Sequence, residues 1–336
     1  MKKYIYIALA AAAFASCSQD EALVLNQEEI TFGDAFVNNA TRAIDPSYNA
    51  TNKLTAFKVW GAVKASDASY VSVFADDAVS GTVGTNSVWN CTSKTQYWIP
   101  DAMYDFAAVV NADTDSEGKS IVTLGDNNKL PATITYTADG STDLLYARSK
   151  QYKGLATNNP KVQFDFAHLL AKVKFTLNNT TPKTTNNGET IETYTYTLTD
   201  IKISNAIKTG VYTVADVAET AVDGVVPSYT IGGSWATTTS APQAFDAIEG
   251  VTNNTDKECA NEKLLIPLED PTVECDVNLY YGGKLITTTH KTTTISNLDA
   301  GHAYNVIVEV GLNNPIQFTV EQDPSWTPNP STEVKI

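Results

Sequence analysis

The sequence contains few basic residues of any kind. Its 336 residues include 38 acidic but only 23 basic ones, which gives a formal net charge of −15. Such an acidic surface repels phosphate backbones and argues against nucleic acid as a partner. The three histidines are scattered, and no H-E-x-x-H, G-x-S-x-G or G-x-x-x-x-G-K-[ST] motif occurs. We therefore predict a protein that is not an enzyme, with no cofactor and no metal.

Long apolar runs are also rare, and the one clear case opens the chain. Two lysines precede an apolar run of about 12 residues that ends at Ala15, shorter than the ~20 residues of a membrane-spanning helix. This layout is typical of a signal peptide, here residues 1–16. The ending "FASC" resembles the lipobox of bacterial lipoproteins, which implies a lipid on Cys17 and an outer-membrane, cell-surface location. Cleavage near Ala15 with Cys17 as a free thiol is the alternative.

Cysteine is too scarce for a disulfide framework. Beyond Cys17 the chain has only Cys91, Cys259 and Cys275, so at most one disulfide can form, with Cys259 and Cys275 the nearest pair in sequence. None has the C-x-x-C spacing of a zinc site. We favour three buried thiols that act as small hydrophobic side chains.

What the sequence does contain is alternation of apolar and polar residues. Clear cases are Val173, Phe175 and Leu177 in "LLAKVKFTL", and Tyr304, Val306, Val308 and Val310 in "HAYNVIVEVG". A period of two predicts strands with one wet face and one core face. Gly, Asn, Asp and Pro clusters separate these segments and supply turns. Many short strands with such turns indicate antiparallel β-sandwiches.

The length of the mature chain predicts two domains, because about 320 residues exceed the usual size of one core. The longest stretch without apolar residues is "NNTTPKTTNNGET", which cannot bury a face. We therefore expect an N-terminal sandwich over 43–178, a linker at 179–190 and a C-terminal sandwich over 191–314.

Several segments resemble the fimbrillins, the type V pilins of Bacteroidota, and in particular their Mfa-like branch. They are the lipoprotein start, "EEITFGDAF", "FKVWG", "YWIPDAMYDFAAV", "DLLYARS", "VQFDFAHLLAKVKFTL" and "LDAGHAYNVIVEVG". The resemblance implies two transthyretin-like β-sandwiches in tandem. It also implies a protease cut after an arginine that releases an N-terminal strand, which the C-terminal strand of the next subunit replaces.

The segment 17–42 fits the released strand. Ile30, Phe32 and Phe36 lie at even spacing and give one apolar face. The Arg42–Ala43 bond is then the processing site, in a loop that a protease can reach. A solvated loop arginine without a role is the alternative. The only other arginine, Arg148, lies in a strand pattern and should be protected by folding.

The complementing strand is expected in the tail 315–336. Ile316, Phe318 and Val320 alternate with polar residues, and Val334 and Ile336 repeat the pattern after three prolines. This predicts a two-part donor strand. The alternative is that residues 315–321 close the subunit's own second sandwich, because an alternating pattern does not say which sheet a strand joins.

Three further signals are interpreted as structural. His168 is expected at a strand start or against the core. The run Asp113–Gly118 resembles a calcium loop, but Leu124 occupies the position of the bidentate glutamate, so a polar turn is predicted. The aromatic residues of the first domain are assigned to the core and not to a sugar-binding platform; they are Trp60, Trp89, Tyr97, Trp98 and Tyr104.

The sequence thus predicts a structural pilin, a fimbrial shaft subunit that supports adhesion. Its partners are other pilin subunits, in a self-polymer or a mixed fimbria, the outer membrane through Cys17, and a host or bacterial surface ligand. One alternative is a monomeric, lipid-anchored surface adhesin or carbohydrate-binding lipoprotein. Another is a pilus anchor subunit, which would keep its lipid and its N-terminal strand.

Overall fold

The computed structural model describes residues 28–37, 54, 56–64, 69–81, 89–91, 93–112, 120–126, 129–186, 189–218 and 229–323. Every regular element in these ranges is a β-strand, so the predicted all-β class is confirmed. Most strands pair antiparallel, but β1 with β10 and β11 with β25 are parallel. No helix with the length and apolarity to cross a membrane occurs in the described ranges.

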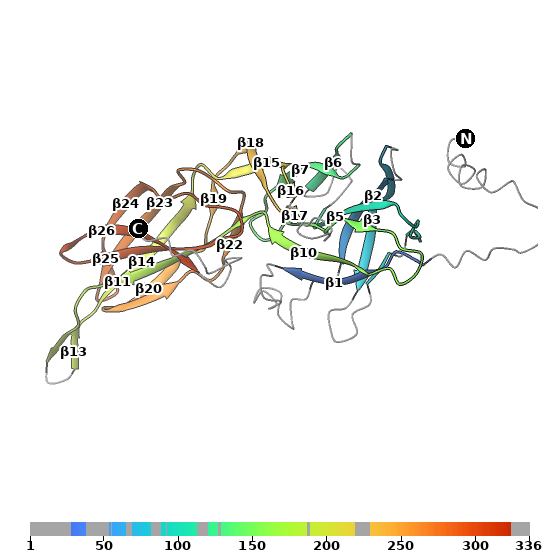
Figure 1. The fold of residues 1–336 in the computed structure, drawn as a ribbon. Coiled ribbons are helices and arrows are strands. Elements are labelled where there is room, and N and C mark those ends of the chain that lie inside the picture. Colours follow the sequence, from blue (N-terminus) through green and yellow to red (C-terminus); the bar gives the residue numbers. More distant parts are fainter. Residues whose placement is uncertain are drawn as a thin grey trace, which may run out of the picture.

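The N-terminal half is a closed ring of strands (Figure 1). In spatial order these are β2 (Ala56–Lys64), β3 (Val71–Gly81), β4 (Trp89–Cys91), β1 (Phe32–Val37), β10 (Val162–His168), β8 (Leu145–Arg148) and β5 (Met103–Val110). Pairing of β5 with β2 closes the ring. The short β9 (Tyr152–Lys153) continues beyond β8 along β5. A closed ring removes the free edges that an open sheet exposes.

The interior of the ring is filled with aromatic side chains. Trp89 and Trp98 are at most 2% exposed, as are Phe106 and Tyr104, so the assignment of these aromatics to the core is confirmed. Trp60 is also buried, but on the outer side of the ring. Tyr97 is 46% exposed and belongs to neither core.

A second sheet covers one outer side of the ring and combines both halves of the chain. It consists of β6 (Ser120–Leu124), β7 (Pro131–Thr137), β15 (Ile207–Val214) and β18 (Gly233–Ser240), and β7 pairs with β15. Its core includes Ile134, Tyr136 and Tyr212 together with Trp60 of β2. Beyond β15 the chain forms the small hairpin of β16 (Val217–Ala218) and β17 (Tyr229–Thr230).

The C-terminal part is a sandwich of two sheets. One contains β21 (Thr255–Glu258), β22 (Lys263–Leu265), β11 (Ala171–Asn179), β25 (Ala303–Gly311) and β26 (Asn314–Asp323). The other contains β19 (Gln243–Ala244), β20 (Ile248–Val251), β14 (Tyr194–Ile203), β23 (Thr272–Tyr281) and β24 (Lys284–Thr294). The alternating residues of β11 and β25 face the core between the sheets, as their period predicts.

The chain crosses from the ring to this sandwich at Leu169 and Leu170, between β10 and β11. Strand β11 then runs to Asn179, whose side chain is fully buried. The segment 179–190 therefore starts inside the sandwich and continues into the hairpin of β12 (Thr184–Asn186) and β13 (Glu189–Glu192). Strands β15 and β18 lie in one sheet with β7 and β6, so this sheet contains strands from both sides of the predicted linker. The division into 43–178, 179–190 and 191–314 stays a prediction.

The three cysteines in the described ranges are free. Cys275 is buried in the sandwich core, and this burial raises the pKa of its thiol to about 12. Cys91 and Cys259 are partly buried and pack against the ring core and the sandwich core. The interpretation of these thiols as hydrophobic side chains agrees with their positions.

Arg148 on β8 is protected by folding, as its sequence pattern predicts. Its side chain is only 8% exposed, and its guanidinium lies 3.5 Å from Asp105 Oδ1 and 3.2 Å from Asp216 Oδ2. The guanidinium also lies 4.3 Å from the ring centre of Tyr229. Burial and the Asp105 carboxylate raise the pKa of Tyr229 to about 12, and its hydroxyl donates a hydrogen bond to Asp105 Oδ1. Arg148 thus joins the ring to the returning segment near β16 and β17.

Replacing Arg148 with alanine should strongly destabilise the fold. The change leaves the carboxylates of Asp105 and Asp216 buried without their cation, which costs about 3–5 kcal/mol of unfolding free energy. Urea denaturation measures this loss. The control is Lys153→Ala, because Lys153 pairs with Asp101 at an exposed site and its loss should cost about 0–1 kcal/mol. Equal, small losses for both variants would contradict the role assigned to Arg148.

Candidate strand-exchange site

Strand β1 is the element that closes the ring between β4 and β10. It runs parallel to β10 from the Phe32–Val162 pair to the Val37–Phe166 pair. Against β4 it makes a single antiparallel pair, between Phe32 and Trp89. Figure 1 shows β1 alongside β10 at the lower side of the ring. If β1 were absent, both β4 and β10 would have an unpaired edge in this part of the ring.

Neither neighbour of β1 is joined to it by a hairpin. Val162 on β10 lies 130 positions after Phe32, and β2 is the next strand along the chain after β1. The strand is therefore held by its backbone ladder and its buried side chains. The interval between Val37 and Ala56 is the connection that joins β1 to the next strand along the chain, β2. Arg42 lies within that interval of the sequence.

The apolar side chains of this segment are buried in the ring core. Ile30, Phe32, Ala35 and Val37 are all at most 6% exposed. The Phe32 ring centre lies 5.5 Å from that of Phe74 and 6.2 Å from those of Phe57 and Phe164. Burial of one large apolar side chain contributes about 1.5–3 kcal/mol. The segment therefore fills an apolar slot that its removal would expose.

The buried face of the segment changes along its length. Ile30 and Phe32 are at even positions, whereas Ala35 and Val37 are at odd ones. The pairing with β10 shifts register between Phe32 and Ala35, which accounts for the change of face. Phe36 pairs through its backbone with Asp165, and its side chain lies outside what the structure describes.

Glu28 fastens the start of this segment to a turn before β10. Its carboxylate accepts hydrogen bonds from the backbone nitrogens of Asn158 and Asn159, both at 2.6 Å, and from Asn159 Nδ2 at 2.9 Å. These bonds lower the pKa of Glu28, with the Asn159 backbone bond as the largest cause. The backbone joins Trp98 N to Glu28 O and Ile30 N to Gln96 O. Sequence reasoning missed Glu28, since its partners lie 130 residues away.

The candidate donor residues lie partly on β26. Ile316, Phe318 and Val320 are half-buried and pack against the sandwich core. Strand β26 pairs with β25 along its whole length and is the edge of its sheet in the described part of the chain. This placement matches the alternative interpretation, in which residues 315–321 close the second sandwich of the same subunit. Cys17, Arg42, Ala43, Val334 and Ile336 lie outside the described residues.

Of the remaining candidates from the sequence, the structure describes His168 and Leu124. His168 ends β10, and its buried Nδ1 lies 2.6 Å from Asp143 Oδ2. Asp113–Gly118 lies outside the described ranges, whereas Leu124 ends β6. In the described part of the chain, no three His, Cys, Asp or Glu side chains come together in a way that would hold a metal ion.

Comparison with known proteins gives the family. The sequence matches the Fimbrillin-like family over residues 41–323. The chain belongs to the fimbrillin-like family. Membership of this family supports a pilus-related role in adhesion at the cell surface, with other pilin subunits as partners, and not an enzymatic role. No curated protein matches the sequence.

Solved structures also resemble this fimbrillin-like chain. A fimbrial protein from Bacteroides vulgatus is 13% identical, with a TM-score of 0.57 over 88% of this chain and 98% of its own. A fimbrial assembly protein from Parabacteroides distasonis is 15% identical, with a TM-score of 0.42 over 88% and 100%. The fimbrial anchor protein Mfa2 from Porphyromonas gingivalis is 12% identical, with a TM-score of 0.39 over 86% and 95%. The likeness in fold rests on the first, since the other TM-scores are too low to support an argument.

Replacing Phe32 with alanine should destabilise the ring. The change leaves a cavity among Phe57, Phe74 and Phe164, and such large-to-small core changes cost about 3–5 kcal/mol. Urea denaturation measures the loss of unfolding free energy. Leu155→Ala is the control, because Leu155 is 47% exposed and its loss should change stability by only about 0.5 kcal/mol. A similar effect of the two changes would show that Phe32 does not fill the core.

The contribution of Glu28 to stability should depend on pH. Because folding lowers the pKa of this carboxyl below 4.5, its contribution is full above that value and is lost as pH falls through the folded pKa. Glu28→Gln should therefore be less stable than the unchanged protein at neutral pH, and the difference should shrink as the pH falls below the pKa of the unfolded carboxyl. Urea denaturation over a series of pH values from neutral to acidic measures it. Glu321→Gln, at an exposed position on β26, is the control, and a pH-independent difference for Glu28→Gln would contradict the assignment.

Proposed function

We propose that this protein is a pilin that polymerises by strand exchange, as a shaft subunit of a fimbrium. The observation that carries the proposal is the position of β1 in the ring. It is flanked by β4 and β10, which are both distant in sequence, and it has no hairpin connection to either. A strand held in this way can be replaced by a strand of another chain with the same backbone pairing.

Proteolysis after Arg42 is the step that frees the strand. The cut falls between β1 and β2, so it separates β1 from the rest of the ring covalently. The only other arginine, Arg148, is buried between two carboxylates. An arginine-specific protease acting on the folded protein therefore has one target. Before processing, a lipid on Cys17 holds the precursor at the outer membrane.

The replacing strand comes from the tail 315–336 of the next subunit. Its first part, with Ile316, Phe318 and Val320, already has a full ladder with β25. We therefore assign the neighbour's slot to the second part, which carries Val334 and Ile336. The 13 residues after Asp323 span about 43 Å when extended. Strand β1, which they would replace, has only six residues, so the tail is long enough to cover its place.

The test is cleavage of soluble protein that starts at Ser18. An arginine-specific protease should cut once, after Arg42, and oligomers that dissociate only on heating should then appear on a denaturing gel run without boiling. Strand-exchanged contacts combine a backbone ladder with buried apolar side chains, so they dissociate slowly.

Three matched variants make the result specific. Arg42→Ala should abolish both cleavage and the oligomer ladder. Protein truncated after Asp323 should be cut normally but should give no ladder, because it lacks the proposed donor. A lysine-specific protease should cut the Arg42→Lys variant after residue 42. Clean cleavage after Arg42 without oligomers would refute self-polymerisation by strand exchange.

A further inference from the structure

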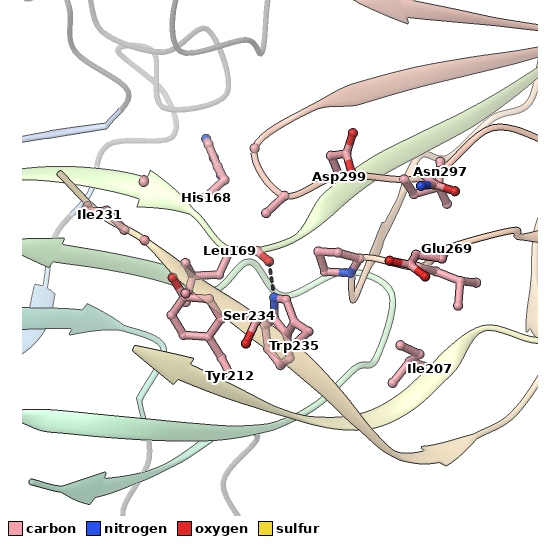
Figure 2. Close-up of a pocket in the computed structure, with 18 of the residues that line it drawn as sticks. His168, Leu169, Ile207, Tyr212, Ile231, Ser234, Trp235, Glu269, Asn297 and Asp299 are labelled. Atoms are coloured by element: carbon pink, nitrogen blue, oxygen red, sulfur yellow. Dashed lines mark hydrogen bonds between the residues drawn. The ribbon is translucent and has the colours of Figure 1, made fainter. Parts of the chain in front are cut away.

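A cleft of about 760 Å³ lies where the sheet of β6, β7, β15 and β18 meets the C-terminal sandwich (Figure 2). Its lining comes from the end of β10, from β15 and β18, and from the loops around residues 267–269 and 297–301. Ligand sites of proteins typically enclose 300–1,000 Å³ and favour the junctions between domains. The cleft is separate from the slot of β1, whose side chains pack in the ring core.

Hydrogen bonds at the chain crossing fix both walls of the cleft. Leu169 O accepts a bond of 3.0 Å from Trp235 Nε1, which is drawn in Figure 2. The next carbonyl, Leu170 O, accepts a bond of 2.9 Å from Gly301 N on the other wall. Leu268 and Leu298 exchange two backbone bonds of 3.0 and 2.9 Å, which join the loops of that wall. The cleft is therefore preformed and does not depend on a ligand to assemble it.

One wall offers an aromatic surface. The rings of Trp235 and Tyr212 lie 5.4 Å apart between centres, and Trp235 is half-buried at the cleft. A Cβ on Gly210 would approach the Trp235 ring to 3.0 Å, so the absence of a side chain there lets the indole lie close to β15. The bond to Leu169 O fixes the orientation of the indole. The indole of Trp235 is therefore a rigid apolar surface in this wall, and the buried Tyr212 ring lies against it at an angle of 51°.

The facing wall carries exposed polar side chains. Glu269, Asn297 and Asp299 lie together in Figure 2, on the far side of the cleft from Trp235 and Tyr212. Asn297 Oδ1 accepts a bond from Asp270 N at 3.1 Å, which leaves its amide nitrogen to act as a donor. The two carboxylates act as acceptors. This wall thus presents donors and acceptors side by side and carries negative charge.

We propose that this cleft binds an uncharged saccharide. A sugar ring has an apolar C–H face, which fits an aromatic surface, and a rim of hydroxyls that both donate and accept hydrogen bonds. The wall with Trp235 supplies the aromatic surface. The wall with Glu269, Asn297 and Asp299 supplies the hydrogen-bonding partners for the hydroxyls. The carboxylates repel acidic sugars. A cationic ligand would use the carboxylates but not the Asn297 donor, whereas sugar hydroxyls can pair with both.

The proposal goes beyond pilus assembly, because it concerns the uncut monomer. The test uses the protein from Ser18, with the probes lactose, N-acetylglucosamine and mannose in ligand-observed saturation-transfer NMR. N-acetylneuraminic acid is the anionic control and spermidine is the cationic one. At least one neutral sugar should receive saturation and should bind with a Kd in the millimolar range or tighter. The charged probes should not bind at this site.

Variants locate the binding. Trp235→Ala and Asp299→Asn should each weaken the affinity for the bound sugar by about tenfold or more. Asp299→Asn and Glu269→Gln keep the fold even if Trp235→Ala does not, because both carboxylates are exposed. Glu249→Gln, another exposed carboxylate outside the cleft lining, should leave the affinity unchanged.

Two kinds of result would overturn the proposal. One is that none of the neutral sugars binds, or that spermidine or N-acetylneuraminic acid binds in their place. The other is that a sugar binds equally well to the unchanged protein, Asp299→Asn and Glu269→Gln. Neither result bears on strand exchange, since cleavage after Arg42 is not part of the experiment.

Discussion

The closure of the N-terminal ring by β1 is the constraint on which the rest of this half depends. The strand pairs with β10 along its backbone and places the buried side chain of Phe32 in the ring interior. No hairpin joins it to either of its neighbours. A ring with one such strand is stable as long as that strand, or an equivalent one, is present. The proposed strand exchange would use the same ladder that stabilises the single subunit.

The two cores outside the ring contain no side chain of β1. Its buried side chains belong to the ring core, whereas Tyr136, Tyr146 and Ile266 belong to the core between the ring and the sheet of β6, β7, β15 and β18. The C-terminal sandwich has a third core of its own. Arg148 additionally joins the ring to the segment near β16 through Asp216. In the proposed exchange, the slot of β1 would therefore open in one core, while the other two cores keep their own side chains.

Local patterns in the sequence predict the strands well and their partners poorly. The alternation of Val173, Phe175 and Leu177 depends only on which face is buried, so it is visible in the sequence. The pairing of β15 with β7 joins residues more than 70 positions apart, for example Thr209 and Thr137. Nothing in an alternating pattern specifies that partner.

The same limit applies to the candidate site. The burial of Ile30 and Phe32 follows from their spacing, but the register shift before Ala35 does not. Glu28 has no local signal, because its role comes from backbone nitrogens of a turn that only folding brings near. The buried side chains before the register shift are therefore predictable, whereas those after it and the polar group that fastens the start of the segment are not.

The scarcity of arginine gives the proposed processing site its selectivity. Lysine outnumbers arginine 21 to 2 in this chain. Arg148, the arginine that the structure describes, makes contacts that suit a guanidinium group. Its planar group reaches Asp105 and Asp216 with different nitrogens and lies over the ring of Tyr229. An ammonium group has no flat face and no fixed fork, so lysine would lose part of this arrangement. Because these contacts also bury Arg148, the arginine that folding requires is hidden from a protease, and Arg42 is the only other one in the sequence.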